Sequence, residues 1–397
     1  MKMRGAKGFT LVELLVAISL GLLVTGAAVA VYKQAVDSTT YLTQRTVVQG
    51  NARAAMNTIS QDLNFAGYGL PIGGIPVPTA ALFSCATGSA AASWAYSCPT
   101  TAPSFPVISG AATMSGITPM YQAGPTINGN ATDQMAMAYV DSSPNFSNNT
   151  CGVSTQCGFD AFPLTQASVS GSTTTLYFNG STTPAPNDTK WGLKVGDILL
   201  VSNSTGQAVG EVTSVTSGNV VLAASDPMKL NQAFGTGGSV PNVLGFSSGI
   251  QAYNNGAGPL QSTNVKRLYI VTYYVATDPL AQAVGTTGNP TRLYRMVNGD
   301  SNTNPPVPVA EQISNLTFSY NMFDSVCGGS QSANQRNPTT NQIGLIKTIN
   351  ASIFAASTLN TTAIPGQAIQ QIPMTTTVSP RNLSYFDSYS STPQGSC

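Results

Sequence analysis

The hydrophobic residues of the chain are most concentrated in one uninterrupted run near the N-terminus. The 24 residues from Phe9 to Tyr32 include a single charged side chain, that of Glu13. Coiled as an α-helix, this run spans about 36 Å, which is enough to cross the roughly 30 Å hydrocarbon layer of a membrane. The pattern therefore predicts a transmembrane helix over residues 9–32.

A helical periodicity continues after the apolar run. Between Lys33 and Phe65 the chain has no Pro and only one Gly. Apolar positions recur there at steps of three and four, which places them on one face of an amphipathic helix: Val48, Ala52, Ala55, Ile59, Leu63 and Ala66. We expect the helix to extend to about residue 64, within an amphipathic segment 33–71 whose end is marked by the sequence GYGLP.

Short alternating patterns dominate the rest of the chain and predict β-strands. Residues 72–260 are rich in Ser, Thr and Gly, with a strand expected at 134–140. Four short runs rich in β-branched residues follow within 174–225, separated by turn residues. They are typical of a small antiparallel sheet or a barrel-like insert.

The last segment, residues 261–397, has the strongest strand patterns. Residues 265–277 and 291–297 predict a hairpin, and 313–323 predicts a further strand. Residues 343–357 and 374–385 predict two closing strands at the edge of the same sheet. The expected fold class is α+β, in which a long N-terminal helix packs against an antiparallel β-sheet that carries a β-rich insertion.

The charged residues of the chain mainly exclude classes of function. Only 8% of the residues are charged, with 16 basic and 15 acidic side chains and no His at all. Without His, catalytic Ser-His-Asp and Cys-His arrangements are impossible, so neither catalysis nor a cofactor is expected. The span between Arg53 and Lys190 has no basic residue but five acids, which argues against a nucleic-acid groove there: Asp62, Asp133, Asp141, Asp160 and Asp188.

Four basic residues on two predicted strands form the densest positive group of the chain: Lys266, Arg267, Arg292 and Arg295. Such a group fits either a DNA-contact patch or a solvated strand face. The solvated face is favoured, and no nucleic-acid partner is expected.

The six cysteines all lie downstream of the apolar run: Cys85, Cys98, Cys151, Cys157, Cys327 and Cys397. An even number of cysteines in an exported chain favours disulfides over a zinc site, which needs the tight CxxC spacing that this sequence lacks. Six cysteines allow 15 connectivities, and pairing in chain order is one of them.

One spacing resembles a calcium loop. Asp300, Asn302 and Asn304 are followed by Glu311 at the twelfth position, as in an EF-hand. Pro305, however, stands where the loop needs a flexible Gly, and the flanks are predicted strands. An ordinary loop is the favoured interpretation, and no metal is expected.

Glu13 admits three interpretations. A cleaved secretory signal peptide would use the Ala28-Val29-Ala30 site but tolerates an acid in its apolar core poorly. A permanent single-span anchor gives Glu13 no purpose, although an acid at the centre of a membrane helix costs about 2.5–3.5 kcal/mol on insertion scales. The third interpretation rests on the residues on either side of Glu13.

The sequence GFTLVE at residues 8–13 begins with the last residue of a basic leader, residues 1–8. It resembles the processing site of type IV prepilins and type II secretion pseudopilins. The resemblance implies that a prepilin peptidase cleaves between Gly8 and Phe9 and N-methylates Phe9. It also implies that Glu13, the fifth mature residue, pairs with the N-terminal amine of a neighbouring subunit during assembly. Two opposite charges in lipid offset each other's desolvation.

More loosely, the chain resembles the PilW-like minor pilins, which are related to the J-type minor pseudopilins of type II secretion. The similar segments are ARAAMNTISQDLNFAGYG (52–69), GDILLV (196–201), TYYV (272–275) and LYR (293–295). This resemblance implies a non-catalytic subunit of the complex that primes pilus assembly at or near the tip. Its partners would be other minor pilins, the major pilin, the prepilin peptidase and the inner membrane.

The implied location is a single-pass inner-membrane protein before assembly and the pilus afterwards, with the head in the periplasm or at the cell surface. A J-like minor pseudopilin of a type II secretion system remains an alternative. So does a pilus-borne adhesin that binds through the polar, charge-poor segment 72–260.

Overall fold

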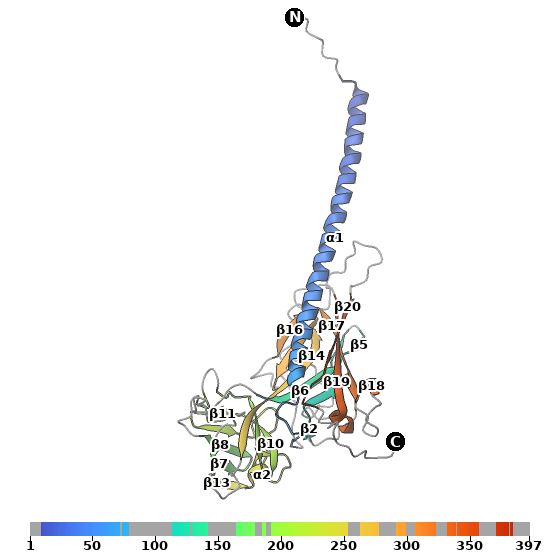
Figure 1. Ribbon diagram of the computed structural model, residues 1–397. Coiled ribbons are helices and arrows are strands. Elements are labelled where there is room, and N and C mark those ends of the chain that lie inside the picture. The colour runs from blue at the N-terminus through green and yellow to red at the C-terminus, as the bar shows by residue number, and fades with distance from the viewer. Residues whose placement is uncertain are drawn as a thin grey trace, which may run out of the picture.

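The computed structural model of the chain describes residues 9–71, 74–78, 113–127, 129–141, 164–178, 185–187, 192–252, 263–277, 291–298, 306–322, 332–338, 340–356, 371–380 and 382–383. One long helix stands above a β-rich head, and a second β-rich lobe lies at the far end of that head (Figure 1). The predicted α+β class, with a long N-terminal helix packed on an antiparallel sheet, is confirmed.

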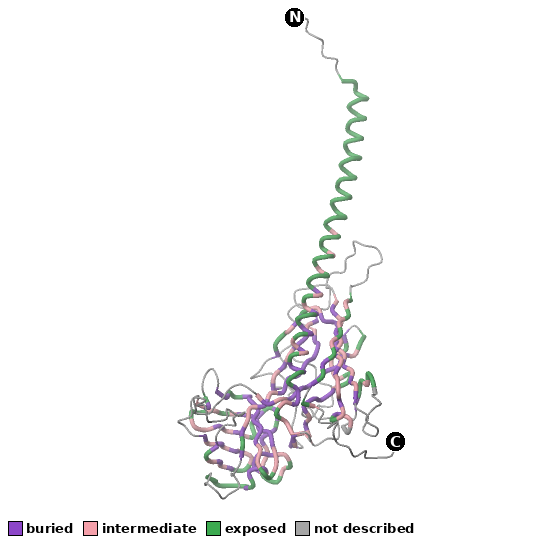
Figure 2. Tube along the Cα trace, in the orientation of Figure 1, coloured by how far each residue is buried: buried purple, intermediate pink, exposed green. Residues whose placement is uncertain are grey.

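Helix α1, Leu11–Phe65, is continuous over 55 residues. Thr10 caps its N-terminus, and Gly67, with a φ of 78°, follows its C-terminus in the left-handed conformation that Gly adopts without strain. Residues 9–36 are all exposed, whereas the face that begins at Val48 is buried against the head (Figure 2). The predicted amphipathic stripe is this buried face.

The buried face of α1 packs on two antiparallel sheets that share one core with it. The four-stranded sheet has the order β18-β17-β19-β20: Ser332–Gln335, Ile313–Met322, Ile346–Ala356 and Gln371–Val378. A 3-10 helix, Thr340–Leu345, precedes β19. The helix also contacts strand β16, Val307–Glu311, of the larger sheet.

The seven-stranded sheet has the path β10-β9-β14-β15-β16, with β6 paired to β14 and β3 paired to β6. The strands not yet given are β3 Ile117–Met120, β6 Gln134–Val140, β9 Ile198–Asn203, β10 Gly206–Glu211, β14 Asn264–Thr277 and β15 Thr291–Val297. Short pairs β1–β2 (Ile75–Pro76, Thr113–Met114) and β4–β5 (Thr126–Ile127, Asn130–Ala131) lie outside these sheets.

Strand β14 contributes to all three hydrophobic cores of the described structure. On its odd-numbered face, Val265 lies in the core of the distal lobe, and Val271 and Tyr273 lie in the core beneath α1. On its even-numbered face, Leu268 and Ile270 lie in a third core between these two. Because its side chains alternate between two faces, this one strand packs in the cores of both the head and the distal lobe.

The distal lobe is a five-stranded sheet of order β11-β12-β8-β7-β13. Its strands are β7 Leu164–Ser170, β8 Thr173–Phe178, β11 Ser214–Val215, β12 Asn219–Leu222 and β13 Ser248–Ala252, with the short helix α2 Val240–Leu244. Its core also takes side chains from β9 and β10.

Two groupings differ from the expectation. The four runs within 174–225 do not form one unit, because β9–β10 joins the sheet of the head while β8 and β12 stay in the lobe. The reason is burial of both faces of β9: Ile198 and Leu200 face one core, Leu199 and Val201 the other. Likewise, the strands of the last segment divide between two sheets rather than closing one.

Candidate functional site

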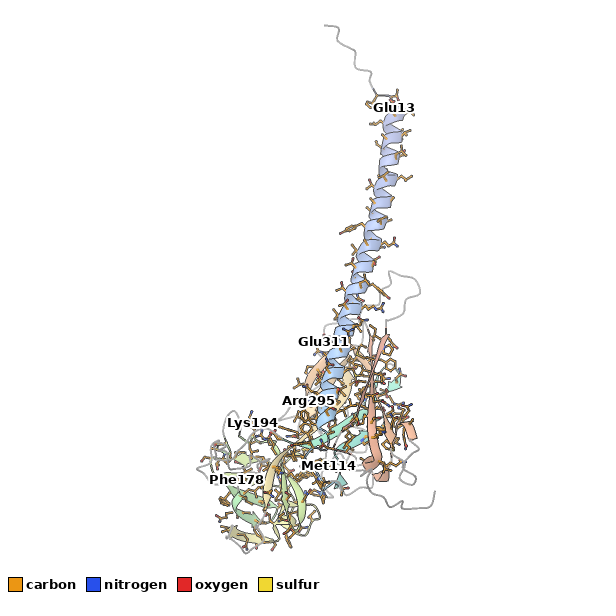
Figure 3. The ribbon with its side chains drawn as sticks, in the orientation of Figure 1. Glu13, Met114, Phe178, Lys194, Arg295 and Glu311 are labelled. Atoms are coloured by element: carbon orange, nitrogen blue, oxygen red, sulfur yellow. The ribbon has the colours of Figure 1, made fainter. Side chains whose placement is uncertain are left out.

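The N-terminal end of α1 combines apolar exposure with one carboxylate. Phe9 is 87% exposed, and Glu13 lies in the first turn of the helix (Figure 3). The Thr10 backbone N–H and hydroxyl each lie 3.1 Å from Glu13 Oε2, and the Glu13 N–H donates to Thr10 Oγ1 at 3.3 Å. Thr10 and Glu13 therefore form a reciprocal capping box. Gly8, the other predicted cleavage residue, lies outside the described residues.

This cap lowers the cost of the carboxylate without neutralising it. The unpaired N–H groups and the positive end of the helix dipole favour a negative charge in the first turn. A net charge of −1 nevertheless remains on a segment whose neighbours are apolar. Glu13 is therefore positioned at the tip of the exposed helix, where a cation from outside the chain can reach it.

The helix beyond Glu13 is suited to a membrane by length and composition. An 18-residue stretch of α1 near the N-terminus has a mean hydropathy of 2.5, and none of it is buried. The polar side chains within it bond to the helix itself: Ser19 donates to the carbonyl of Val16 and Thr25 to that of Gly21. Such bonds satisfy hydroxyl groups where no water is present.

The opposite end of α1 carries a second acid, in different surroundings. Asp62 is buried against the sheet, and Arg295 Nε donates to its Oδ2 at 2.7 Å. The Tyr273 hydroxyl donates to the same oxygen at 2.6 Å, and the Tyr139 hydroxyl lies 3.5 Å from Oδ1. The carboxylate is thus fully engaged by partners from β6, β14 and β15, which fixes the helix on the sheet.

In the sequence, Asp62 stands out only as one of five acids in a span without bases. Its partner Arg295 is 233 residues away, so no local pattern connects them. A signal was present, however: Asp62 falls within the apolar stripe of the helix, three residues after Ile59 and beside Leu63. An acid on a buried stripe requires a buried partner.

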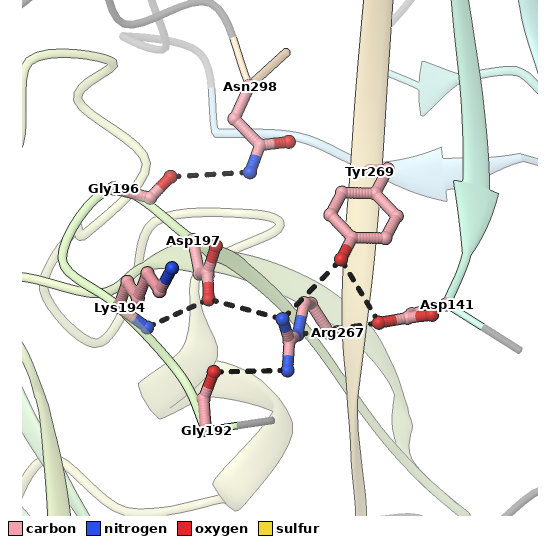
Figure 4. Close-up of polar contacts among 8 residues, drawn as sticks. All are labelled: Asp141, Gly192, Lys194, Gly196, Asp197, Arg267, Tyr269 and Asn298. Atoms are coloured by element: carbon pink, nitrogen blue, oxygen red, sulfur yellow. Dashed lines mark hydrogen bonds and ion pairs between the residues drawn. The ribbon is translucent and has the colours of Figure 1, made fainter. Parts of the chain in front are cut away.

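A second polar cluster joins the head to the distal lobe (Figure 4). Arg267 on β14 lies 3.6 Å from Asp141 and 3.9 Å from Asp197, and it donates to the carbonyl of Gly192 at 3.2 Å. The Tyr269 hydroxyl donates to Asp141 Oδ2 at 3.1 Å. One arginine therefore holds the end of β6 and the approach to β9 together.

Burial sets the electrostatics of this junction. Burial raises the pKa of Asp197 above its ordinary value, and the Arg267 guanidinium opposes the shift. Burial also raises the pKa of Tyr269 to about 12. The rings of Tyr269 and Tyr139 lie 5.8 Å apart and connect this junction to the Asp62 cluster.

The basic group on the two strands is used within the fold. Arg267 and Arg295 bind the buried acids described above, and Arg292 forms an ion pair with Glu311 at 2.9 Å. The structure therefore contradicts the expectation of a solvated face for Arg267 and Arg295, whereas Arg292 and its exposed partner Glu311 remain at the surface. Tertiary pairing between distant strands, which sequence spacing does not reveal, accounts for the difference.

The remaining predicted sites fall largely outside the described residues. Of the calcium candidates, Asp300, Asn302 and Asn304 lie outside them, and Glu311 has the arginine partner just given. Within the described part of the chain, no group of three or more metal-binding side chains occurs. All six cysteines also lie outside it, namely Cys85, Cys98, Cys151, Cys157, Cys327 and Cys397, so their pairing stays a prediction.

Comparison with known proteins bears on the N-terminal end. Residues 3–29 match the model of the prokaryotic N-terminal methylation motif. The match covers most of the basic leader, the GFTLVE sequence and most of the apolar run, and it supports a substrate of prepilin peptidase of the type IV pilin or pseudopilin type. Neither the curated proteins nor the solved structures yield a significant match to the chain.

Proposed function

We propose that the chain is a minor type IV pilin of the PilW-like kind, a non-catalytic subunit of the complex that primes pilus assembly at or near the tip. The observation that carries the proposal is the methylation motif on residues 3–29, at the free end of a helix whose other end is fixed in a folded head. A helix exposed over its first 26 residues has the form of a subunit that packs in a bundle with copies or relatives.

The geometry suggests the order of events. The apolar half of α1 inserts into the inner membrane and the head folds on the outer side. Prepilin peptidase cleaves between Gly8 and Phe9, and the new N-terminal amine of Phe9 is methylated. Glu13, held at the helix tip by Thr10, then meets the N-terminal amine of a neighbouring major or minor pilin. Their attraction is strong because the surroundings are apolar.

The test measures the processing and the filament incorporation of the Glu13→Ala variant in a piliated host that expresses the chain. We expect leader cleavage, read by mass spectrometry of the mature N-terminus, to be largely intact, with methyl-Phe9 as the first residue. We expect the amount of the chain in sheared filaments to fall at least tenfold, because the unpaired amine of the neighbour stays in lipid. Asp37→Ala, the next acid along the helix, serves as the matched control and enters filaments normally.

Two outcomes oppose the proposal. A mature chain that begins at Met1 or Val31 indicates an uncleaved anchor or an ordinary signal peptide, and no filament role follows. Normal incorporation of Glu13→Ala shows that the charge pairing does not drive docking.

A further inference from the structure

A hollow of about 210 Å³ opens on the outer face of the four-stranded sheet, where β17 begins. Strands β17, β19 and β20 lie together at this side of the head, beside β5 (Figure 1). The hollow is lined by Ile127, Asn130, Ser314, Asn315, Phe354 and Gln371. Its lining therefore combines three side-chain amides, one hydroxyl, one aromatic ring and one aliphatic side chain, with no charged group.

The floor of the hollow is held in place by strand pairing and a hydrogen bond, and its wall contains the side-chain amide of Asn315. Asn315 is paired with Phe354 across β17 and β19, and the Ser314 hydroxyl donates to the Phe354 carbonyl at 3.0 Å. Within the described part of the chain, Asn315 Oδ1 is inaccessible to solvent and has no hydrogen-bond partner. The Asn315 side chain is thus packed into the wall of the hollow, where its amide helps to make the lining polar.

A platform of amides and hydroxyls extends from the hollow along the same face. Its members lie on alternate positions of three neighbouring strands: Thr317, Ser319, Asn321, Thr348, Asn350, Ser352, Thr375 and Thr377. The positions between them, such as Phe318 and Ile353, point into the core. This face of the three strands is thus polar and uncharged.

Hydrogen bonds within the platform hold its side chains in place. Thr377 Oγ1 donates to Asn350 Oδ1 at 2.7 Å, and the Ser352 and Thr375 hydroxyls lie 2.9 Å apart. Strands lie about 4.8 Å apart, and successive outward positions lie about 7 Å apart along each strand. The platform thus presents hydroxyl and amide groups at regular intervals in two directions.

We infer that this face binds a neutral polysaccharide, with one sugar ring in the hollow and the following rings on the platform. Amides and hydroxyls both donate and accept hydrogen bonds, as sugar hydroxyls require. The Phe354 ring offers an apolar surface to the C–H face of a pyranose. The absence of charge among the lining residues gives an anionic or cationic ligand no ion-pairing partner there. The site belongs to the head and does not depend on the filament role.

The test uses the full chain in micelles of a zwitterionic detergent, because detergents with sugar head groups would compete. Saturation-transfer NMR is recorded with methyl glucoside, methyl mannoside and methyl N-acetylglucosaminide, and with the corresponding β-linked or α-linked tetrasaccharides. We expect saturation of at least one sugar, and at least tenfold tighter binding of its tetrasaccharide. Alginate serves as the anionic probe.

Two surface variants separate the hollow from the platform. Gln371→Ala, at an exposed position that begins an edge strand, should weaken binding of the monosaccharide and of the tetrasaccharide at least fivefold. The double variant Thr375→Ala/Thr377→Ala should weaken only the tetrasaccharide. Thr165→Ala, an equally exposed strand position in the distal lobe, is the matched control and should change neither.

The inference is overturned if no neutral sugar shows saturation, if alginate alone binds, or if Gln371→Ala binds as the wild type does. An unchanged thermal unfolding midpoint in each variant shows that a loss of binding is not a loss of folding.

Discussion

The two halves of α1 have one backbone geometry and opposite surroundings. The half after Val48 presents a buried stripe to the sheet, and its acid, Asp62, is held by one arginine and two tyrosines of the same chain. The half before it is exposed (Figure 2). Among the described residues, its acid, Glu13, is bound only by Thr10 in the first turn of its own helix. The half after Val48 is covered by the chain itself, whereas the half before it is left for a membrane or a neighbouring subunit to cover.

This contrast shows what helical pattern alone can encode. A stripe with steps of three and four indicates a partner on one side, and here the partner is the sheet of the same chain. Apolar residues all round indicate a partner on every side, and the described part of the chain buries none of this stretch. Asp62 in the buried half and Glu13 in the exposed half differ in the same way, so substitutions of these two acids test the contrast directly.

The largest expected effect comes from a matched pair of leucines. Leu63→Ala removes a fully buried side chain and should lower the free energy of unfolding of the head by about 2–5 kcal/mol. Leu15→Ala, at a position that is 62% exposed, should leave it unchanged. Urea unfolding of the full chain in micelles, followed by near-ultraviolet circular dichroism, measures both. Equal effects would mean that the apolar half also stabilises the head.

The two acids form the second comparison. Asp62→Ala leaves Arg295 and Tyr273 without their acceptor and should destabilise the head by about 3 kcal/mol. Tyr273→Phe removes one of these hydrogen bonds and should cost about 1 kcal/mol. Gln61→Ala, the exposed neighbour on the same turn, is the control and should stay within about 0.5 kcal/mol of the wild type. Glu13→Ala should leave head stability unaffected.

A smaller effect is expected at the helix tip. Thr10→Val removes the hydroxyl of the capping box and should destabilise the first turn by about 1 kcal/mol. Faster hydrogen exchange of the amides near Glu13, with no change in the unfolding of the head, would show it. Thr25→Val makes the same exchange within the helix, where the hydroxyl bonds only to Gly21, and should leave those amides unchanged. Protection that survives Thr10→Val would mean that the box does not hold the acid.

The smallest effect concerns pH at the junction with the lobe. Because burial raises the pKa of Asp197 in the folded state, the folded chain binds this proton more tightly than the unfolded chain, whose carboxyl titrates near pH 4. The contribution of Asp197 to stability is therefore fully present below about pH 4 and is lost as the pH rises through the folded-state value. Lys194 and Arg267 face the carboxyl and oppose the shift, whereas Asp141 adds to it.

Asp197→Asn abolishes this titration. The free energy of unfolding of the variant minus that of the wild type should therefore rise between pH 4 and pH 7, as measured by urea unfolding at several pH values. Asp226, whose pKa burial also raises, is present in both proteins and cancels in the difference. A difference that falls with pH would show that Arg267 outweighs burial.

Local periodicity accounts for what the sequence predicted well. The helix was predictable because its apolar positions lie three and four apart, and strands β6 and β14 because their runs favour extended backbone. The methylation motif around Gly8, Phe9 and Glu13 was recognisable because it is contiguous, and the roles of these three residues stay predictions. Each of these predictions depends on neighbours within a few residues.

What the sequence did not reveal depends on distant pairs. The division of the strands into three larger sheets follows from which faces are covered, and both faces of β9 are covered largely by elements far from it in sequence. The partners of Arg267 and Arg295 lie up to 233 residues away, so their expected solvated face was wrong. The uncharged platform on β17, β19 and β20 likewise emerges only when the strands are in register.

Strand β14 has a mechanical consequence. Its 14 residues span about 47 Å when extended, and they pair with β9 at one end and β15 at the other. A pull on α1 enters this strand through Tyr273, beside Asp62, and travels along a continuous backbone to the lobe. Tilting the distal lobe relative to α1 would require breaking hydrogen bonds between β14 and its neighbouring strands, because no hinge separates them along β14. The head and the distal lobe should therefore move together, so that a displacement of α1 is passed on to the far end of the lobe.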